Sequence, residues 1–256
     1  MAHILIIDSD PAALNARARA QGRLAAGDGY ANALRQVRRD LEITIVAPYD
    51  GDAIPDLGAF DGVAFTGSGV EWNTDDARAE PLAVVMREVF SRGIPAIGSC
   101  NGMQLAASVL GGSSDASPNG REDGLALDVR LTEAGRVHPM MAGRRDGYAV
   151  PCVHRDEVVR LPDGAVLLAG NAHSPVQAFA YEQDGVRFWG MQYHPEYEPE
   201  DMARMLGPDG RATPGQVNDF NAAKADPVAA QRLGARPQEL CPPHRMVEFR
   251  NWLASL

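Results

Sequence analysis

The chain has 256 residues, of which 45% are hydrophobic and 23% are charged. This length can bury a substantial core, and the composition excludes a disordered or collagen-like chain. The 24 basic residues are outnumbered by 34 acidic ones, and the net charge of −10 repels phosphate backbones, so we expect no nucleic-acid binding.

The first residues and the cysteines indicate a cytoplasmic protein. The run MAHILIID lacks the basic flank and the length of a signal peptide, and no stretch approaches the roughly 20 apolar residues of a membrane helix. Cys100, Cys152 and Cys241 are odd in number and form no CxxC pair, which favours a reducing compartment. We therefore expect a cytoplasmic location and no contact with membranes.

Residues 1–110 alternate between short apolar runs and helix-like stretches. The runs predict parallel strands that are buried on both faces, at residues 2–8, 41–47, 62–66 and 94–98. Residues 30–38 and 77–90 place apolar side chains at helical spacing. This alternation predicts an open, mostly parallel α/β sheet. The arginine-rich segment 15–23 is expected to be a solvated face, and a lid or partner-docking helix is the alternative.

The pattern changes after Leu110. Residues 111–123 are expected to form a loop, and shorter strand candidates follow at residues 125–131, 165–169, 176–181 and 186–191, where antiparallel strands can join the sheet. Residues 207–243 are rich in Gly, Pro, Asp and Ala, and residues 246–256 again predict an amphipathic helix. We expect one domain over residues 1–256, with a core to about residue 206 and a tail, 207–256, that returns to cover it.

Cys100 lies where a predicted strand ends and a predicted helix begins, in the run IPAIGSCNGMQLAASVL. Gly98 and Gly102, two residues to either side, permit the strained turn of a nucleophile elbow, which lifts a side chain clear of the sheet. A thiol at a helix N-terminus is also favoured as the nucleophilic thiolate. The alternative is a small apolar cysteine packed at a strand end.

A second run, RFWGMQYHPEYEP, ends a predicted strand at His194, Pro195 and Glu196. Residues two apart in an extended segment project to the same side, so the Glu196 carboxylate can orient the His194 ring. Alone, this step is equally consistent with a capped turn. Together with Cys100 it supplies a nucleophile, a base and an orienting group, provided that the fold brings the two runs together.

The two runs together resemble the class I (triad) glutamine amidotransferases, whose usual forms are GxCxGxQ and QxHPE. DGVAFTGSG is similar to the family's strand and oxyanion loop, REDGLALDV to its REIGW-type segment, and VHRDEVVRLPDGAVLLA to its SHxDxVxxLPxG segment. RMVEFRNWL resembles the closing helix of stand-alone members similar to the amidotransferase half of GMP synthase. The resemblance covers nearly the whole chain, and it implies the family's flavodoxin-like fold with a mixed, mostly parallel sheet flanked by helices.

The resemblance also implies a mechanism. Cys100 attacks the γ-amide carbon of glutamine, His194 takes the thiol proton and returns it to the departing ammonia, and Glu196 orients His194. A γ-glutamyl thioester results, and water releases glutamate.

The oxyanion and the substrate need further groups. The resemblance assigns the oxyanion donors to the backbone N–H of Asn101 and to the loop around Gly67 and Ser68. Gln104, one helical turn after Cys100, would line the glutamine pocket, and a polar residue on a half-exposed helix is an equally good interpretation. Asn101 and the Gly67–Ser68 pair differ from the residues most common in the family, so the pocket rim and the substrate are expected to differ too.

The remaining candidates predict no further chemistry. No spacing resembles a zinc site, and the chain contains no P-loop or GxGxxG loop, so we expect no metal and no cofactor. Cys152 and Cys241 are expected to be packing thiols. His154 and Asp156 match the family's HxD segment, which is usually structural or at a partner surface.

The motifs leave the physiological reaction open. The leading interpretation is a glutaminase or amidotransferase that passes ammonia to an acceptor, with any synthetase as a separate protein because the chain contains no nucleotide-binding half. The alternative is a γ-glutamyl hydrolase that acts on γ-glutamyl amines or peptides with the same three residues. A non-catalytic binding module is a third possibility, which the intact triad disfavours.

Overall fold

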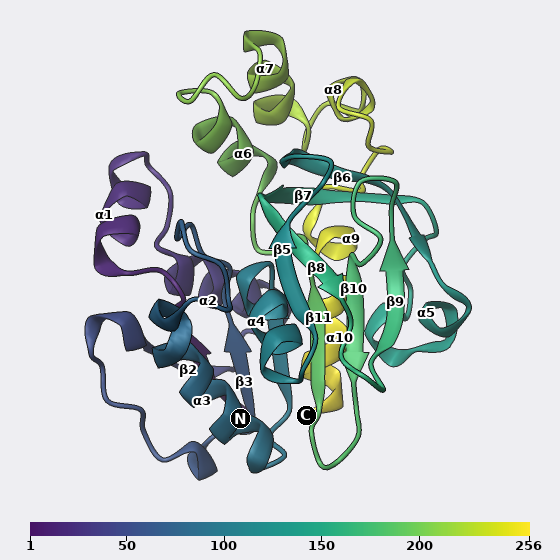
Figure 1. Cartoon of the computed structure of the whole chain (residues 1–256). Coiled ribbons are helices and arrows are strands. Elements are labelled where there is room, and N and C mark those ends of the chain that lie inside the picture. Colours follow the sequence, from purple (N-terminus) through teal and green to yellow (C-terminus); the bar gives the residue numbers. More distant parts are fainter.

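A nine-stranded sheet forms the centre of the computed structural model, which describes residues 1–256 (Figure 1). Its strand order is β2-β1-β3-β4-β11-β10-β9-β6-β7. The parallel part comprises β2 (Glu42–Val46), β1 (His3–Ile7), β3 (Gly62–Phe65), β4 (Ala96–Ser99) and β11 (Phe188–Met191). The antiparallel part comprises β10 (Ala178–Tyr181), β9 (Val166–Gly170), β6 (Glu122–Leu131) and β7 (Tyr148–His154). The predicted fold class, a mostly parallel mixed sheet flanked by helices, is confirmed.

Helices cover both faces of the parallel strands. α2 (Ala26–Val37) and α10 (Val247–Ser255) lie on one face, and α3 (Glu80–Ser91) and α4 (Asn101–Val109) on the other (Figure 1). The alternation along β1 shows why both faces are filled. Ile4 and Ile6 pack with α2 and α10, whereas Leu5 and Ile7 pack with α3 and α4. The runs at 2–8, 62–66 and 94–98 therefore became central strands, whereas the run at 41–47 became the edge strand β2, which is only partly buried, contrary to the prediction.

Residues 111–123 are not the loop that the sequence predicts. β5 (Ser113–Ala116) lies within them and pairs with β8 (Asp156–Arg160) in a separate two-stranded sheet, and β6 already begins at Glu122. The residues of β5 are Ser, Ser, Asp and Ala, so its strand conformation comes from pairing with a distant segment and not from an apolar pattern. β7 was not predicted either. It contains Pro151, which is tolerated because β7 is the edge strand of the large sheet.

Segment 15–23 lies mostly in a helix, α1 (Ala12–Ala20), of which only Asn15 and Ala18 are buried. The Asn15 side chain anchors the helix, because its amide nitrogen donates to Asp8 and its oxygen accepts from the backbone of Ala26. α1 follows β1 and stands above the carboxyl ends of the parallel strands, across from α6 (Pro199–Leu206) (Figure 1). Leu14 is half-buried, and the other residues of the helix are exposed, as expected for segment 15–23.

The Gly- and Pro-rich segment 207–243 contains short helices. α7 (Pro214–Ala222), α8 (Pro227–Arg232) and α9 (Pro242–Arg245) each begin with a proline, a residue suited to the first helical position because its missing N–H has no partner there anyway. α7 and α8 pack with α6 in a small apolar cluster of their own. The division of the chain into a core and a tail that covers it stays a prediction.

The remaining helices are short. They are α5 (Glu133–Val137) and the 3₁₀ turns η1 (Pro48–Asp50), η2 (Leu57–Ala59), η3 (Ala77–Ala79) and η4 (Pro139–Met141). None of the helices combines the length and the apolar character needed to cross a membrane.

Candidate active site

Cys100 occupies a strained turn between β4 and α4. Its backbone has φ 48° and ψ −107°, a conformation that non-glycine residues rarely adopt. The flanking glycines allow the turn to pack closely. A Cβ added to Gly98 would lie 2.7 Å from the backbone of Gly102, and one added to Gly102 would lie 2.6 Å from the carbonyl oxygen of Phe65. The structure therefore contains the elbow that the sequence predicts.

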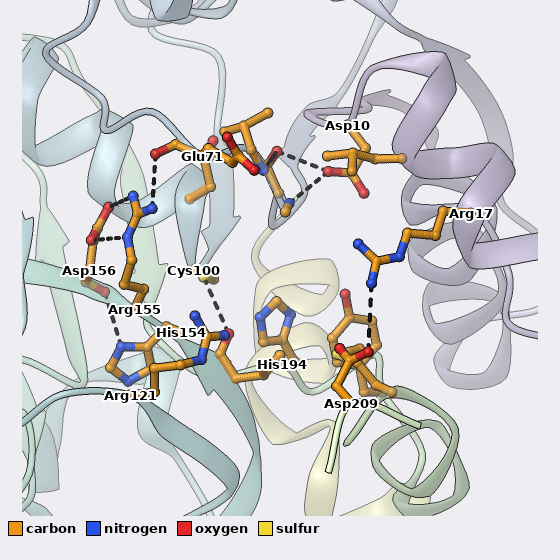
Figure 2. Close-up of a pocket in the computed structure, with 18 of the residues that line it drawn as sticks. Asp10, Arg17, Glu71, Cys100, Arg121, His154, Arg155, Asp156, His194 and Asp209 are labelled. Atoms are coloured by element: carbon orange, nitrogen blue, oxygen red, sulfur yellow. Dashed lines mark hydrogen bonds and ion pairs between the residues drawn. The ribbon is translucent and has the colours of Figure 1, made fainter. Parts of the chain in front are cut away.

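His194 and Glu196 meet Cys100 from the segment after β11. The His194 amide donates to the carbonyl of Pro151, its Nδ1 lies 2.7 Å from Glu196 Oε1, and both side chains are buried. Tyr197 stacks on the imidazole with ring centroids 4.3 Å apart. The other ring nitrogen, Nε2, faces no other hydrogen-bond partner and is left for the adjacent thiol of Cys100 (Figure 2). The fold thus brings the two sequence motifs together.

The charge state of His194 follows from its neighbours. Burial disfavours the charged ring, but the Glu196 carboxylate and the Cys100 thiol outweigh burial and raise the pKa of His194 to about 10. An imidazolium beside a thiol is an arrangement that activates cysteine for attack. The Glu196 carboxylate thus favours the charged form of the ring that lies beside the Cys100 thiol.

Replacing Glu196 with glutamine should lower the pKa of His194, because an uncharged amide no longer favours the cationic ring. The ring resonances of His194 in ¹³C-edited NMR spectra should show no titration between pH 6 and 8 in the wild type, and they should titrate at a lower pH in the variant. A wild-type resonance with a midpoint near its ordinary value, about 6.5, would contradict this assignment.

The loop after β3 carries the predicted oxyanion donors. The N–H groups of Gly67 and Ser68 donate to no acceptor, and that of Asn101 opens helix α4, where it has no intrahelical partner. Asp10, at the end of β1, holds this loop in place. Its Oδ1 accepts from the Ser68 hydroxyl at 2.9 Å and from the Gly69 N–H at 2.8 Å. The Ser68 hydroxyl is bound to Asp10, so the group of Ser68 that stays free to donate is its backbone N–H.

Gly67→Ala should reduce activity by about a hundredfold or more, because an added Cβ would lie 2.4 Å from Cε1 of His194 and would displace the ring. Gly69→Ala is the matched comparison in the same loop. Its Cβ would meet Leu14 Cδ1 at 3.5 Å, an ordinary contact, so its loss should be much smaller. The ratio of kcat/KM between the two variants measures the effect, and equal losses would contradict it.

The cavity around Cys100 has a volume of about 300 Å³. Of the predicted site residues, Cys100, His194, Ser68, Asn101 and Gln104 line it, whereas Gly67 and Glu196 do not. The amide nitrogen of Gln104 donates to the carbonyl of Asp156 at 2.6 Å and to Gln192 at 3.2 Å. Gln104 therefore supports the segment that carries Asp156, in addition to forming part of the wall.

Sequence reasoning missed a chain of charged side chains at the rim of the cavity. Arg17 on α1 faces Asp209 at 3.7 Å, Asp209 and Asp123 both pair with Arg211, and Asp123 also pairs with Arg121. Figure 2 shows the Arg17–Asp209 contact on the far side of His194 from Arg155 and Asp156. The only feature of the sequence that pointed to these ion pairs was the Arg-rich segment 15–23, because their acidic partners are distant in the sequence.

A buried polar cluster lies next to the cavity, around Glu122. Ligating atoms of Glu122, Cys152 and His154 all lie within 4.8 Å of one another, a spacing that could hold a metal ion. Their lone pairs are nevertheless engaged: Glu122 accepts from His154, Asn171 and Gln177. Burial and the Glu122 carboxylate also raise the pKa of Cys152 well above its ordinary value, which disfavours a thiolate ligand. The cluster has the properties of a structural hydrogen-bond network.

Comparisons with known proteins agree with this geometry. A family model described as "Glutamine amidotransferase class-I" matches residues 25–207. A γ-glutamyl-L-1-hydroxyisopropylamide hydrolase from a Pseudomonas species is 31% identical, and the match covers 99% of this chain and 92% of that protein. A GMP synthase from Streptomyces avermitilis is 36% identical over 46% of this chain, but over only 21% of its own length. A glutamine amidotransferase of known structure from Thermotoga maritima shares the fold, with a TM-score of 0.69, 18% identity and coverage of 99% and 97% of the two chains.

Proposed function

Because the chain belongs to the class I glutamine amidotransferase family, we propose that it hydrolyses the γ-glutamyl amide of a small amine through a thioester on Cys100. Members of this family cleave a γ-glutamyl C–N bond as hydrolases or amidotransferases, and both activities fit the matches. The observation that carries the proposal is the buried contact between His194 and Glu196 with Nε2 left for Cys100. This arrangement supplies a nucleophile, a base and an orienting group.

In the proposed reaction the Cys100 sulfur attacks the γ-carbonyl carbon. The oxyanion of the tetrahedral intermediate accepts from the N–H of Asn101 and from those of Gly67 and Ser68, and losing one such donor typically costs about 3 kcal/mol of barrier. His194 then donates its proton to the leaving nitrogen as the C–N bond breaks. Water attacks the thioester with His194 as base, and glutamate leaves.

Hydrolysis of a substituted amide is favoured over glutaminase activity by the extent of the sequence match. The Pseudomonas hydrolase corresponds to this chain over nearly its full length, including segments on both sides of the family core. The GMP synthase match is restricted to less than half of the chain. A glutaminase that passes ammonia to a separate synthetase is the second candidate, because GMP synthases match part of this chain.

A cytoplasmic location belongs to the proposal. It is supported by Cys100, Cys152 and Cys241, which are all free thiols. Free thiols persist in the reducing conditions that the cytoplasm provides.

The test is release of glutamate and of the amine by the purified chain from γ-glutamyl-L-1-hydroxyisopropylamide, beside release of ammonia from glutamine. Rapid release of the amine by this chain alone, with no partner protein added, would support the hydrolase. Slow ammonia release with no cleavage of the substituted amide would favour the synthetase-dependent glutaminase. Intact wild-type chain that cleaves neither compound would overturn the proposal.

A further inference from the structure

We infer that α1, α6 and the segment after α6 form a subsite for the leaving amine, and that this subsite selects amines with a short aliphatic body over ammonia. The inference rests on the proposed function. It adds the residues that decide which γ-glutamyl amide is cleaved.

The proton donor fixes the side on which the amine leaves. His194 must protonate the leaving nitrogen, so the amine lies on the His194 side of Cys100. Figure 2 shows Arg155, Asp156 and His154 on one side of Cys100, and His194, Arg17 and Asp209 on the other. The amine therefore leaves toward α1 and the residues that follow α6.

Apolar side chains line this part of the cavity. Leu14 extends from α1, Met205 from α6, and Tyr197 stacks on the His194 ring. Leu14 also reaches the oxyanion loop, since its Cδ1 lies 3.5 Å from the position of a Cβ on Gly69. These three side chains would bury the carbon atoms of a leaving amine and so stabilise its binding. Ammonia has no carbon atoms and would gain no such stabilisation.

The charges on this side are balanced. Arg17 and Arg211 both face Asp209, and the charge of Arg23 acts on Asp10. Because its cations already have acidic neighbours, this wall has no unpaired charge that would favour binding of a charged leaving group. It can still offer a hydrogen bond to a hydroxyl at the end of a short chain.

One wall of this part of the cavity is α1, and the other is α6 with the residues that follow it. The Arg17–Asp209 contact joins these two walls. The side chains are 62% and 36% exposed, and pairs this exposed contribute little stability, so the contact can open to admit a substrate. Part of this subsite lies beyond the family match. α1 and Asp209 are outside residues 25–207, whereas the catalytic triad is inside. The subsite thus combines Tyr197 and Met205, inside the family match, with Leu14 and Arg17 of α1 and with Asp209, outside it.

The experiment compares kcat/KM for γ-glutamylisopropylamide, γ-glutamylethylamide and glutamine with the wild-type chain. Each buried methyl or methylene carbon should raise the preference by about fourfold, so the ethylamide, with two such carbons, should exceed glutamine by roughly fifteenfold. Leu14→Ala and Met205→Ala should each lower the ratio of alkylamide to glutamine several-fold. Leu14→Trp, which fills the same space, should lower that ratio as well, and thermal melts identify any variant that fails to fold.

A control on the same helix is available in Arg19. It pairs with Asp28 at 3.3 Å, is as exposed as Arg17 and does not line the cavity, so Arg19→Ala should keep the wild-type ratio that Leu14→Ala and Met205→Ala lower. Folded variants of Leu14 and Met205 with an unchanged ratio would overturn the subsite while leaving the hydrolase intact. Failure of the wild type to cleave any γ-glutamyl compound would overturn both.

Discussion

Cys100→Ser should abolish amide hydrolysis, with a loss in kcat/KM of at least about a thousandfold. A serine hydroxyl is far less acidic than a thiol, so the imidazolium of His194 cannot hold its conjugate base at neutral pH. The oxyanion donors and the cavity are unaffected by the change of one atom. Binding of substrate should therefore persist while the chemical step is lost.

Two measurements separate this loss from unfolding. Mass spectrometry of the acid-quenched wild type with substrate should detect a γ-glutamyl adduct, and Cys100→Ser should lack it. Cys241→Ser is the control, because Cys241 lies in the C-terminal segment and its thiol donates to the carbonyl of Lys224, 3.9 Å away. It should retain wild-type turnover. An adduct on another residue would contradict the assignment of Cys100 as the nucleophile. A Cys100→Ser variant that keeps a tenth of the wild-type rate would contradict it too.

The sequence predicts those features of the fold that depend on local pattern. β1 is an example, because Ile4 and Ile6 face one layer of helices while Leu5 and Ile7 face the other, so that the run is apolar throughout. The elbow at Cys100 and the His194–Glu196 step were likewise predictable, because the required residue types are close in sequence. Their meeting in space was expected only from the family resemblance.

Features that depend on contacts between distant segments were not predictable. β5 becomes a strand by pairing with β8, although its own residues are mostly polar. Asp10 holds the oxyanion loop through Ser68 and Gly69, and in the sequence it is one of many acidic residues. The Arg17–Asp209 contact depends on helix α1, which buries so few residues that no apolar period marks its role.

Arg144→Met should destabilise the protein by about 3–5 kcal/mol, the usual result of leaving one member of a buried ion pair without its partner. Arg144 and Glu248 are 2% and 0% exposed and are joined by two hydrogen bonds of 2.8 and 2.7 Å. Burial disfavours the charged guanidinium, but Glu248 outweighs it and raises the pKa of Arg144. In the variant the Glu248 carboxylate would remain buried without this cation.

The pair connects the C-terminal helices to the strand that leads into the active site. Glu248 on α10 accepts from the hydroxyl of Tyr193, the residue before His194, and Arg144 also donates to the carbonyls of His244 and Arg245. Arg245 in turn donates to the carbonyl of Pro195, between His194 and Glu196. Loss of Arg144 should therefore make the position of His194 less fixed, in addition to destabilising the fold. The kcat should fall even under conditions in which the variant is still folded.

Denaturant unfolding at pH 7 measures the stability effect, and a second substitution tests its cause. Arg144→Met combined with Glu248→Leu removes both charges, so it should recover much of the stability that the single variant loses. Arg87→Met is the exposed comparison. Arg87 pairs with Glu80 at the surface, with side chains 49% and 58% exposed, and its loss should cost less than about 1 kcal/mol. If the double variant were less stable than Arg144→Met, packing around the guanidinium and not an uncompensated carboxylate would be the cause.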